Sequence, residues 1–369
     1  MKKRILFPFS AKTRGGSTIS SLMLIEKLQK KNFETVILMH GKGPGIEFLK
    51  KRKLDYIKTH ILYYNENENF FNFLFKSIIN FIPMIRILIR IKPSIIHLND
   101  SKMVNTWTIF AKIFKLKIII HQRTPLYRSR FLEYNLKKAD GVIVISDYIR
   151  TSLDVLKLKN VHLVYNPFIH PTNDNKSLRE NVCTKNNINK DSFIVGYFSR
   201  FDKRKRPELF IEASNKINGN NDIKFIMMGM FENKPFKNKI INLIRQKNLS
   251  EHIFIEEFNH NVFEALRTFD VLVCPAIDEG FGRTIIEAGL AKIPVIAAKS
   301  GAFRELINEN ETGLFFEPDN VNDLSNKILK IYSDHELRNH VRNNSYKIFN
   351  EKFVNNNYVE DLVNIYDNL

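Results

Sequence analysis

The sequence predicts an α/β protein built from two Rossmann-like, doubly wound domains that face a central cleft. Three observations predict this fold class. Short β-rich runs alternate with helix-length amphipathic segments along the whole chain. Several of these runs are apolar at consecutive positions, as expected for strands that are covered on both faces. A polar, Asn-rich stretch at 171–191 interrupts the alternation, and 369 residues suffice for two domains.

The first domain is expected over residues 1–170. Its predicted strands are short runs rich in β-branched and other apolar residues. They lie at 4–9, 35–39, 94–98, 117–121, 141–146 and 161–165. Segments between them, such as ISSLMLIEKLQKK at 19–31, have apolar residues at three- and four-residue spacing and are predicted to be helices.

The second domain is expected over residues 192–350, after a linker at 171–191. Its predicted strands lie at 193–198, 223–229, 252–257, 271–276, 294–298 and 313–317. Three helical segments follow, and the last, within 351–369, is expected to pack back toward the first domain. Ligands of such sheets bind at the carboxyl ends of the strands, so a site is expected in a cleft between the domains.

The net charge of +18 is unevenly distributed. Residues 1–170 hold 30 Lys and Arg against 11 Asp and Glu, whereas residues 171–369 hold 27 against 28. A surplus of positive charge of this size gives information about binding partners rather than about the fold. It predicts a basic surface that faces an anionic lipid headgroup, a polyphosphate carrier or nucleic acid. The alternative is a solvated basic face together with a general bias toward lysine.

The stretch DEGFGRTIIEAG, residues 278–289, holds two glutamates separated by seven residues. It follows a predicted strand and opens a predicted helix, where backbone amides suit a phosphate and glycines let a ligand approach closely. The carboxylates of Glu279 and Glu287 can each accept hydrogen bonds from neighbouring sugar hydroxyls. The stretch therefore predicts a nucleotide diphosphate sugar site. The alternative is that Glu279 caps the helix and Glu287 lies on the surface.

A second stretch, GYFSRFDKRKRPELFIEA at 196–213, places basic residues after another strand. Arg200 follows the strand, and Lys205 precedes a helix opened by Pro207. Two cations at the carboxyl end of a strand could hold a diphosphate through charge-assisted hydrogen bonds. The alternative is a solvated loop, because five of the seven residues from Arg200 to Arg206 are basic.

Together, these motifs resemble those of the retaining glycosyltransferases of family 4, which have the GT-B fold and are also described as glycosyl transferases group 1. The shared pattern pairs R-x(4)-K with E-G-F-G-x(4)-E. It continues in PVIA (294–297), KSGAFREL (299–306) and ETGLFFEPDN (311–320). The resemblance is clear over residues 193–349 and weaker in the first half. The matching segments there are RILFPFSAKTRGGS (4–17), KPSIIHLND (92–100), IIIHQRTP (118–125) and VYNPF (164–168).

The resemblance implies a role for each matching residue. Arg200 and Lys205 would hold the donor diphosphate and stabilise the charge that grows on the leaving group. Glu287 would bind the ribose hydroxyls, and Glu279 would contact the hydroxyls of the donor sugar. His121 matches a frequent histidine near the donor sugar or the acceptor, and a buried or capping histidine is the alternative. The residues expected to approach the donor through their backbone are Gly15, Gly16, Gly280, Phe281, Gly282, Arg283 and Thr284.

The resemblance also implies the chemistry. Substitution on the front face of the donor is expected, with the leaving phosphate helping to deprotonate the acceptor, so Glu279 is not assigned as a nucleophile. No cofactor and no metal ion are expected, because Arg200, Lys205 and a helix dipole supply positive charge and the chain has no DxD triplet. The loop expected to contact the base has EEFNH at 256–260 where glycine is usual, which leaves a UDP-sugar and a GDP-sugar open as donors.

A basic and apolar region in the first half of the chain is a candidate surface for binding the acceptor. Residues 50–53 are all basic, and residues 69–92 are dense in Phe and Ile with scattered cations. They predict a surface that binds anionic lipid on the inner face of the cytoplasmic membrane. The resemblance implies a glycan or lipid-linked oligosaccharide acceptor in bacterial surface polysaccharide synthesis. The alternative is a core helix at 69–92. The two cysteines fit no metal-ligand spacing and indicate a reducing, cytoplasmic location.

Two other functions are open at this stage. A nucleotide-sugar epimerase of the same two-domain shape would need further carboxylates and histidines for deprotonation at C2 and would use no acceptor. A non-catalytic polyanion-binding protein would use the basic half but leaves the spacing of Glu279 and Glu287 unexplained. Because the sequence shows no recognisable nucleic-acid module, no nucleic-acid partner is expected.

Overall fold

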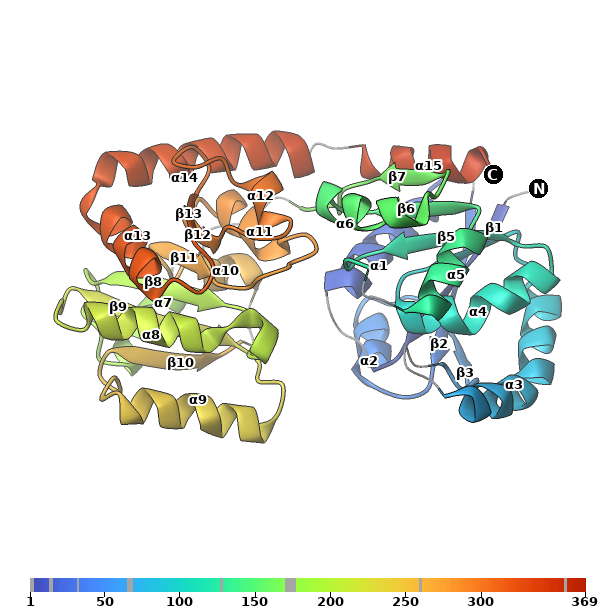
Figure 1. Cartoon of the computed structure of the whole chain (residues 1–369), viewed down its shortest axis with the longest axis horizontal. Coiled ribbons are helices and arrows are strands. Elements are labelled where there is room, and N and C mark those ends of the chain that lie inside the picture. Colours follow the sequence, from blue (N-terminus) through green and yellow to red (C-terminus); the bar gives the residue numbers. More distant parts are fainter. Residues whose placement is uncertain are drawn as a thin grey trace. The chain divides into compact units, whose positions relative to one another are not determined.

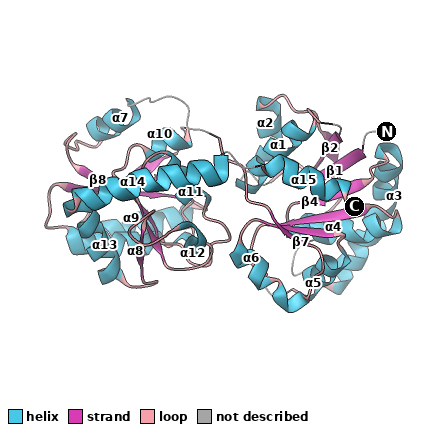
Figure 2. Cartoon of the chain, turned by 90° about the horizontal axis from the view of Figure 1, so that it is seen from above, coloured by secondary structure: helices cyan, strands magenta, loops and turns pink. Residues whose placement is uncertain are grey.

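The structure is a computed structural model, and it describes residues 3–12, 16–31, 33–64, 69–126, 129–169, 177–258, 261–354 and 357–369. The chain divides into two compact units. Unit 1 comprises Met1–Pro167 and Asn357–Leu369, and unit 2 comprises Phe168–Asn356. Each unit has one sheet flanked by helices (Figure 1; Figure 2).

Unit 1 has a seven-stranded sheet of order β3-β2-β1-β4-β5-β6-β7, in which every pairing is parallel. The strand order reverses between β1 and β4, which is the Rossmann arrangement. The strands are β1 (Lys3–Ser10), β2 (Phe33–His40), β3 (Ile57–Thr59), β4 (Ile95–Leu98), β5 (Lys117–Gln122), β6 (Gly141–Val144) and β7 (Val161–Leu163). The sequence analysis missed β3, because its three residues include Lys58 and Thr59 and form no apolar run.

The helices of unit 1 connect successive strands, and the last one comes from the end of the chain. They are α1 (Gly16–Leu28), α2 (Pro44–Lys51), α3 (Phe70–Ile91), α4 (Ser101–Ile113), α5 (Arg130–Lys138), α6 (Asp147–Ser152), a 3₁₀ turn (Asp154–Leu156) and α15 (Tyr358–Asp367). Polar residues start several of them. The Asn69 side chain accepts from the Asn72 amide at α3, and the Asp100 side chain accepts from the Met103 amide at α4. Helix α15 buries Tyr358, Leu362 and Tyr366 in the core of unit 1.

Unit 2 repeats this arrangement with a six-stranded parallel sheet of order β10-β9-β8-β11-β12-β13. The order reverses between β8 and β11. The strands are β8 (Phe193–Phe198), β9 (Ile223–Gly229), β10 (Ile253–Glu257), β11 (Val271–Cys274), β12 (Val295–Ala298) and β13 (Leu314–Phe316). All residues of β11 and β12 are buried, which explains their uninterrupted apolar sequence. Each unit therefore confirms the predicted Rossmann-like, doubly wound fold.

The helices of unit 2 are α7 (Ser177–Lys185), a 3₁₀ turn η2 (Lys203–Lys205), α8 (Pro207–Ile217), α9 (Lys234–Gln246), α10 (Val262–Leu266), α11 (Arg283–Leu290), α12 (Phe303–Leu306), α13 (Val321–Ser333), α14 (His335–Phe349) and a π-helical turn (Asn350–Val354). Helix α7 lies inside the segment predicted as a linker. Its Arg179 binds the Thr268 carbonyl at 2.9 Å and the Asp270 carboxylate at 3.0 Å, which holds this polar helix on unit 2. Residues 171–176 of that segment lie outside the described residues.

No helix in the described ranges combines the length and the apolar composition needed to cross a membrane. Helix α3 is nevertheless apolar on an exposed face. Its most exposed apolar residues are Phe71, Phe75, Ile78, Ile82 and Ile89, each with more than half of its surface accessible. The opposite side packs on the unit through Met84 and Leu88, which are buried. One side of α3 is therefore packed in the core, as the alternative of a core helix at 69–92 expects, and its other side is exposed.

Candidate functional site

The predicted donor residues of unit 2 follow the two strands at which the strand order reverses. Arg200 and Lys205 lie in the loop after β8, and Glu279 to Glu287 follow β11. Strands β8 and β11 pair directly, with Val195 opposite Val271. Their carboxyl ends therefore bring both loops to one edge of the sheet, which is the position where open α/β sheets bind ligands.

A buried aspartate organises the loop after β8. The Asp202 side chain accepts a hydrogen bond from the Lys205 amide at 3.0 Å and thereby starts the turn η2. Its other oxygen accepts from Arg200 Nε at 2.7 Å. Asp202 is only 4% exposed, so both basic residues are positioned by a rigid group. No role was predicted for Asp202, although an Asp three residues before Lys205 is a capping signal.

Glu279 links the two loops. Its Oε2 lies 2.6 Å from Lys205 Nζ and 2.8 Å from Arg204 NH1. Burial raises the pKa of the Glu279 carboxyl, but Lys205 and Arg204 outweigh this and hold that pKa below its usual value. Glu279 is therefore ionised at neutral pH and acts as an acceptor only. Arg204 was missed by the sequence analysis, because spacing does not show which of several adjacent basic residues makes the contact.

The backbone of Glu279 is fixed by the loop after β12. The Ala302 amide donates to the Glu279 carbonyl at 2.9 Å, and the Asp278 amide donates to Ser300 Oγ at 3.1 Å. Gly301 has φ +55°, and a Cβ there would lie 2.8 Å from the Glu279 amide nitrogen and carbonyl oxygen. This close approach explains why the loop carries glycine at that position.

The N-terminus of α11 lies in the same region. Gly282 precedes the helix in a left-handed conformation with φ 88°, and no side chain caps the helix. The alternative that Glu279 caps this helix is therefore wrong. A helix start without a side-chain cap can bind a phosphate through its amides and its dipole.

Glu287 lies one turn into α11 and is buried, so the alternative of a surface residue is also wrong. Its Oε1 accepts from Arg283 Nε at 2.8 Å, and the Arg283 guanidinium lies over the Phe168 ring at 4.4 Å. Burial raises the pKa of the Glu287 carboxyl, and Arg283 opposes this effect. Phe281 is buried beside Phe168, with ring centroids 6.1 Å apart.

Unit 2 has a pocket of about 90 Å³ at the carboxyl ends of β8 and β11. Five predicted residues contribute to it: Lys205, Glu279, Gly282, Arg283 and Thr284. The other four predicted residues of this unit, Arg200, Gly280, Phe281 and Glu287, are not among the lining residues. The Arg200 guanidinium is bound to Asp202. Five of the nine predicted donor residues of this unit thus line one pocket, which contains the Glu279 carboxylate and the cations of Lys205 and Arg283.

Three of the predicted residues, Gly15, Gly16 and His121, belong to unit 1. Gly16 is exposed at the start of α1, and Gly15 lies outside the described residues. His121, on β5, is 1% exposed and lies 3.2 Å from Arg123 NH2 through its Nδ1. Burial, Arg123 and His97 together lower the pKa of His121 well below its usual value. His121 is therefore a neutral imidazole at physiological pH.

Arg123 joins α1 to the segments that follow β4 and β7 in unit 1. Its guanidinium donates to Asn166 Oδ1 at 2.6 Å, to Ser21 Oγ at 3.2 Å and to Asn99 Oδ1 at 3.4 Å. Asn166 follows β7, Ser21 lies on α1, and Asn99 follows β4. This segment was one of those that match the family pattern, and the pattern predicted no role for Arg123.

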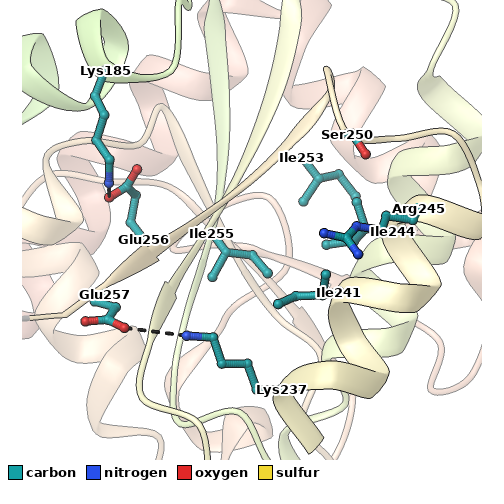
Figure 3. A pocket seen from close by; sticks show the side chains of 10 residues that line it. All are labelled: Lys185, Lys237, Ile241, Ile244, Arg245, Ser250, Ile253, Ile255, Glu256 and Glu257. Carbon is teal, nitrogen blue, oxygen red and sulfur yellow. Dashed lines mark hydrogen bonds and ion pairs between the residues drawn. The ribbon is translucent and has the colours of Figure 1, made fainter. Parts of the chain in front are cut away.

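A larger hollow of about 670 Å³ lies elsewhere on unit 2, between α9 and β10 (Figure 3). Lys185 Nζ lies 2.7 Å from Glu256 Oε2, and Lys237 Nζ lies 3.6 Å from Glu257 Oε1. Two of its cations are thus neutralised within the hollow, and none of the predicted donor residues lines it. Its size alone does not make it the better candidate, and the smaller pocket carries the relevant chemistry.

Two family models match the chain. The family described as "Glycosyl transferases group 1" matches residues 179–348, and the family described as "Glycosyltransferase Family 4" matches residues 14–168. The first covers most of unit 2 and the second covers most of unit 1. Together they account for both units of the fold.

Curated relatives are similar to this chain over different lengths. A poly(ribitol-phosphate) alpha-N-acetylglucosaminyltransferase of Staphylococcus aureus is 28% identical over 244 residues, which cover 64% of this chain and 46% of that protein. The match thus spans about half of that relative. The capsular polysaccharide biosynthesis glycosyltransferase CapM of Staphylococcus aureus is 25% identical, covering 90% of this chain and 94% of that protein. The O-antigen biosynthesis glycosyltransferase WclY of Escherichia coli is 26% identical, covering 69% and 73%.

Solved structures share the fold over the whole chain. Anabaena Alr3699/HepE in complex with UDP has a TM-score of 0.84 at 18% identity and covers 100% of both chains. A glycosyltransferase from Rickettsia africae has a TM-score of 0.84 at 22% identity, covering 100% of this chain and 98% of that chain. These likenesses establish the two-unit fold called GT-B.

Proposed function

Because the chain belongs to the family 4 glycosyltransferases with the GT-B fold, we propose that it moves a sugar from a nucleoside diphosphate sugar to a glycan acceptor, with retention of anomeric configuration. The biological setting we propose is the synthesis of a bacterial surface polysaccharide. It is supported by relatives named for capsule, O-antigen and lipopolysaccharide core synthesis.

One observation carries the proposal: Glu279 and Lys205 meet at the strand-order reversal of unit 2, 2.6 Å apart. Lys205 and Arg204 would meet the donor diphosphate and stabilise the negative charge that develops as the nucleoside diphosphate leaves. The ionised Glu279 would accept hydrogen bonds from the donor sugar's hydroxyls. The uncapped start of α11 adds amide donors to the phosphates.

In this proposal Lys205, Arg204 and the start of α11 supply the positive charge, and no metal ion takes part. In the reaction we propose, the acceptor hydroxyl attacks the anomeric carbon, the bond to the diphosphate breaks, and the leaving phosphate takes the proton of the hydroxyl. Glu279 forms no covalent bond in this reaction.

The donor is tested first among UDP-sugars. HepE was solved with UDP-glucose, and the Staphylococcus aureus TarM structure contains UDP. The purified protein is incubated with UDP-, GDP- and ADP-sugars, and release of the nucleoside diphosphate is measured. Slow release from one donor, lost in Glu287→Ala, is expected, and ¹H NMR of the released or transferred sugar should show the anomeric configuration of the donor. An inverted product would contradict retention.

The acceptor we propose is lipid-linked, because α3 offers a surface that fits a membrane. Phe71, Phe75, Ile78 and Ile82 recur at three- and four-residue spacing on its exposed face. The helix contains no acidic residue and carries Lys76, Arg86 and Arg90. Together with the basic surplus of residues 1–170, this composition fits an anionic bilayer on the cytoplasmic side.

Vesicle sedimentation tests this surface. Vesicles of phosphatidylcholine with and without phosphatidylglycerol are mixed with the protein at low and high salt. Ile78→Glu should weaken binding to the anionic vesicles, because it places a charge where the acyl boundary would be. The control Val155→Glu changes an equally exposed apolar residue elsewhere on unit 1 and should bind like the parent. Equal binding to both vesicle types at both salt concentrations would remove the proposal.

A further inference from the structure

The Arg283 side chain holds a buried carboxylate in unit 2. Arg283 is the first residue of α11, and Glu287 lies four residues later on the same face of the helix. Arg283 Nε donates to Glu287 Oε1 at 2.8 Å. Glu287 is only 9% exposed, and an ionised carboxylate at such a depth is unfavourable unless it is paired. Arg283 therefore provides the pairing that Glu287 needs.

A cluster of buried aromatic rings fixes the guanidinium of Arg283. Its central carbon lies 4.4 Å from the centroid of the Phe168 ring, a distance at which the ring attracts a cation. The Phe168 ring is held in turn by Phe281 and Phe353, with ring centroids 6.1 Å and 5.9 Å away. A planar guanidinium can stack on a ring and donate from Nε at the same time, which an ammonium cannot do. The direction of the bond to Glu287 is thereby set by the packing.

The pairing occupies one of the two carboxylate oxygens of Glu287. Arg283 takes Oε1, and no hydrogen bond from the described residues reaches Oε2. A carboxylate can accept several hydrogen bonds, so Oε2 remains available to a ligand. Because Oε1 is anchored, the position of Oε2 is fixed before any ligand arrives.

The surroundings of Glu287 make its charge depend on Arg283. Burial raises the pKa of the Glu287 carboxyl, and Arg283 is the one titratable group among the described residues that opposes this effect. Helix α14 packs on α11 beside Gly289 through Phe349 and Ser345, which carry no charge. Without Arg283, the carboxyl would therefore be protonated more readily and would accept hydrogen bonds less well.

We propose that Arg283 is a positioning residue that holds Glu287 as an acceptor, with Oε2 presented to the ribose hydroxyls of the donor. This inference rests on the proposed function for the identity of the ligand, whereas the pairing of Arg283 with Glu287 does not. Lys205 and Arg204 would meet the diphosphate independently of this pair. Recognition of the ribose, and not of the phosphates, should therefore depend on the Arg283 side chain.

Calorimetry of the full chain tests this dependence with UDP and GDP and their 2′-deoxy and 3′-deoxy analogues. The parent should bind at least one deoxy analogue about 10-fold more weakly than the ribonucleotide, the loss of a hydrogen bond to a charged group. Arg283→Met keeps an apolar chain over Phe168 but should bind the two ligands within about threefold of each other. Its affinity for the deoxy analogue should stay within about threefold of the parent's, because the phosphate contacts remain.

A second measurement needs no ligand. In ¹³C spectra of protein labelled at the glutamate carboxyl carbon, Glu287→Gln assigns the Glu287 signal, and a pH titration gives its midpoint. The midpoint should lie at higher pH in Arg283→Met than in the parent, since the opposing cation is gone. Lys292→Met, which removes an ammonium 4.7 Å over the Tyr346 ring just past the end of α11, is the control and should change neither readout.

The outcomes separate the two proposals. An Arg283→Met protein that keeps the parent's discrimination between ribonucleotide and deoxy analogue would overturn the positioning role, and so would an unchanged Glu287 midpoint. If the midpoint moves as expected but the parent binds no nucleoside diphosphate, the proposed function fails, while the control of Glu287 by Arg283 stands.

Discussion

Acidification should destabilise unit 1 through two buried histidines. His40, on β2, is 1% exposed. Its Nε2 accepts from Trp107 Nε1 at 3.0 Å, and its Nδ1 faces the Ile61 carbonyl at 3.1 Å. The ring is therefore neutral with its proton on Nδ1, and a second proton on Nε2 would face the indole N–H. Burial lowers the pKa of His40 to about 4 despite the favourable Ile61 carbonyl.

The pKa of His97, on β4, is also lowered by burial. Burial and Arg123 lower the pKa of His97 to about 3, although Asn99 opposes this shift. A histidine with a pKa lowered by folding stabilises the folded state above its ordinary pKa of about 6.5, and this stabilisation is lost as the pH falls toward the folded-state pKa. At pH 5, about 1.5 units below the ordinary pKa of histidine, protonation stabilises the unfolded chain by about 2 kcal/mol per histidine. Unit 1 should thus lose about 4 kcal/mol between pH 7.5 and pH 5 from these two groups.

Trp107 is the single tryptophan of the chain and is fully buried in unit 1, so its fluorescence reports unfolding of this unit. Urea titrations at pH 7.5 and pH 5 give the difference directly. His40→Gln should reduce the pH-dependent loss by about 2 kcal/mol, the share of His40, because His97 and His121 still contribute. His60→Asn, which changes an exposed side chain of the same unit, should keep the loss of the parent. Equal urea midpoints for the parent at the two pH values would refute the reasoning.

Three further predictions concern unit 2. Gly301→Ala should destabilise unit 2 by about 1–3 kcal/mol in differential scanning calorimetry and weaken donor binding. The left-handed backbone and the 2.8 Å approach to Glu279 leave no room for a methyl group, and an unchanged transition would contradict this close approach. Glu279→Gln should bind UDP at least as tightly as the parent in calorimetry, because Lys205 and Arg204 lose their counterion. Its kcat should fall by roughly 100-fold. A parallel loss of UDP affinity and kcat would argue against a role of Glu279 in contacting the sugar. Gly196→Ala should unfold unit 2 at lower temperature, because a Cβ would lie 2.1 Å from the Phe269 ring; a parent-like midpoint would show that the ring moves freely.

The fold was largely predictable because both sheets are parallel and buried. Strands covered on both faces need continuous apolar runs, and the sequence shows such runs for β1, β8 and β11. Strand β3 was missed because only three residues pair with β2, and no apolar run marks them. Helix α7 was missed because its polar sequence is held by Arg179, whose partners lie 13 to 91 residues away.

The candidate site was predictable only where its residues follow one strand closely. The spacing of Arg200, Lys205 and Glu279 relative to strands β8 and β11 was visible in the sequence. The contact of Arg204 with Glu279 spans 75 residues, and that of Arg123 with Ser21 spans 102 residues. Contacts between such distant positions depend on the topology, so no local pattern shows them. Asp202 was the exception, since its capping position could have been found.

The central claim, that the cations after β8 hold a donor diphosphate beside Glu279, is tested most directly by titration calorimetry of UDP and UDP-sugars against two matched variants. Lys205→Met removes the ammonium that contacts Glu279, and Lys203→Met removes an exposed ammonium two residues earlier in the same turn. The account predicts that Lys205→Met weakens nucleotide binding by about 10- to 100-fold, the loss of one charge-assisted hydrogen bond, while Lys203→Met binds within about threefold of the parent. Equal affinities of the two variants for a nucleotide that the parent binds would contradict it.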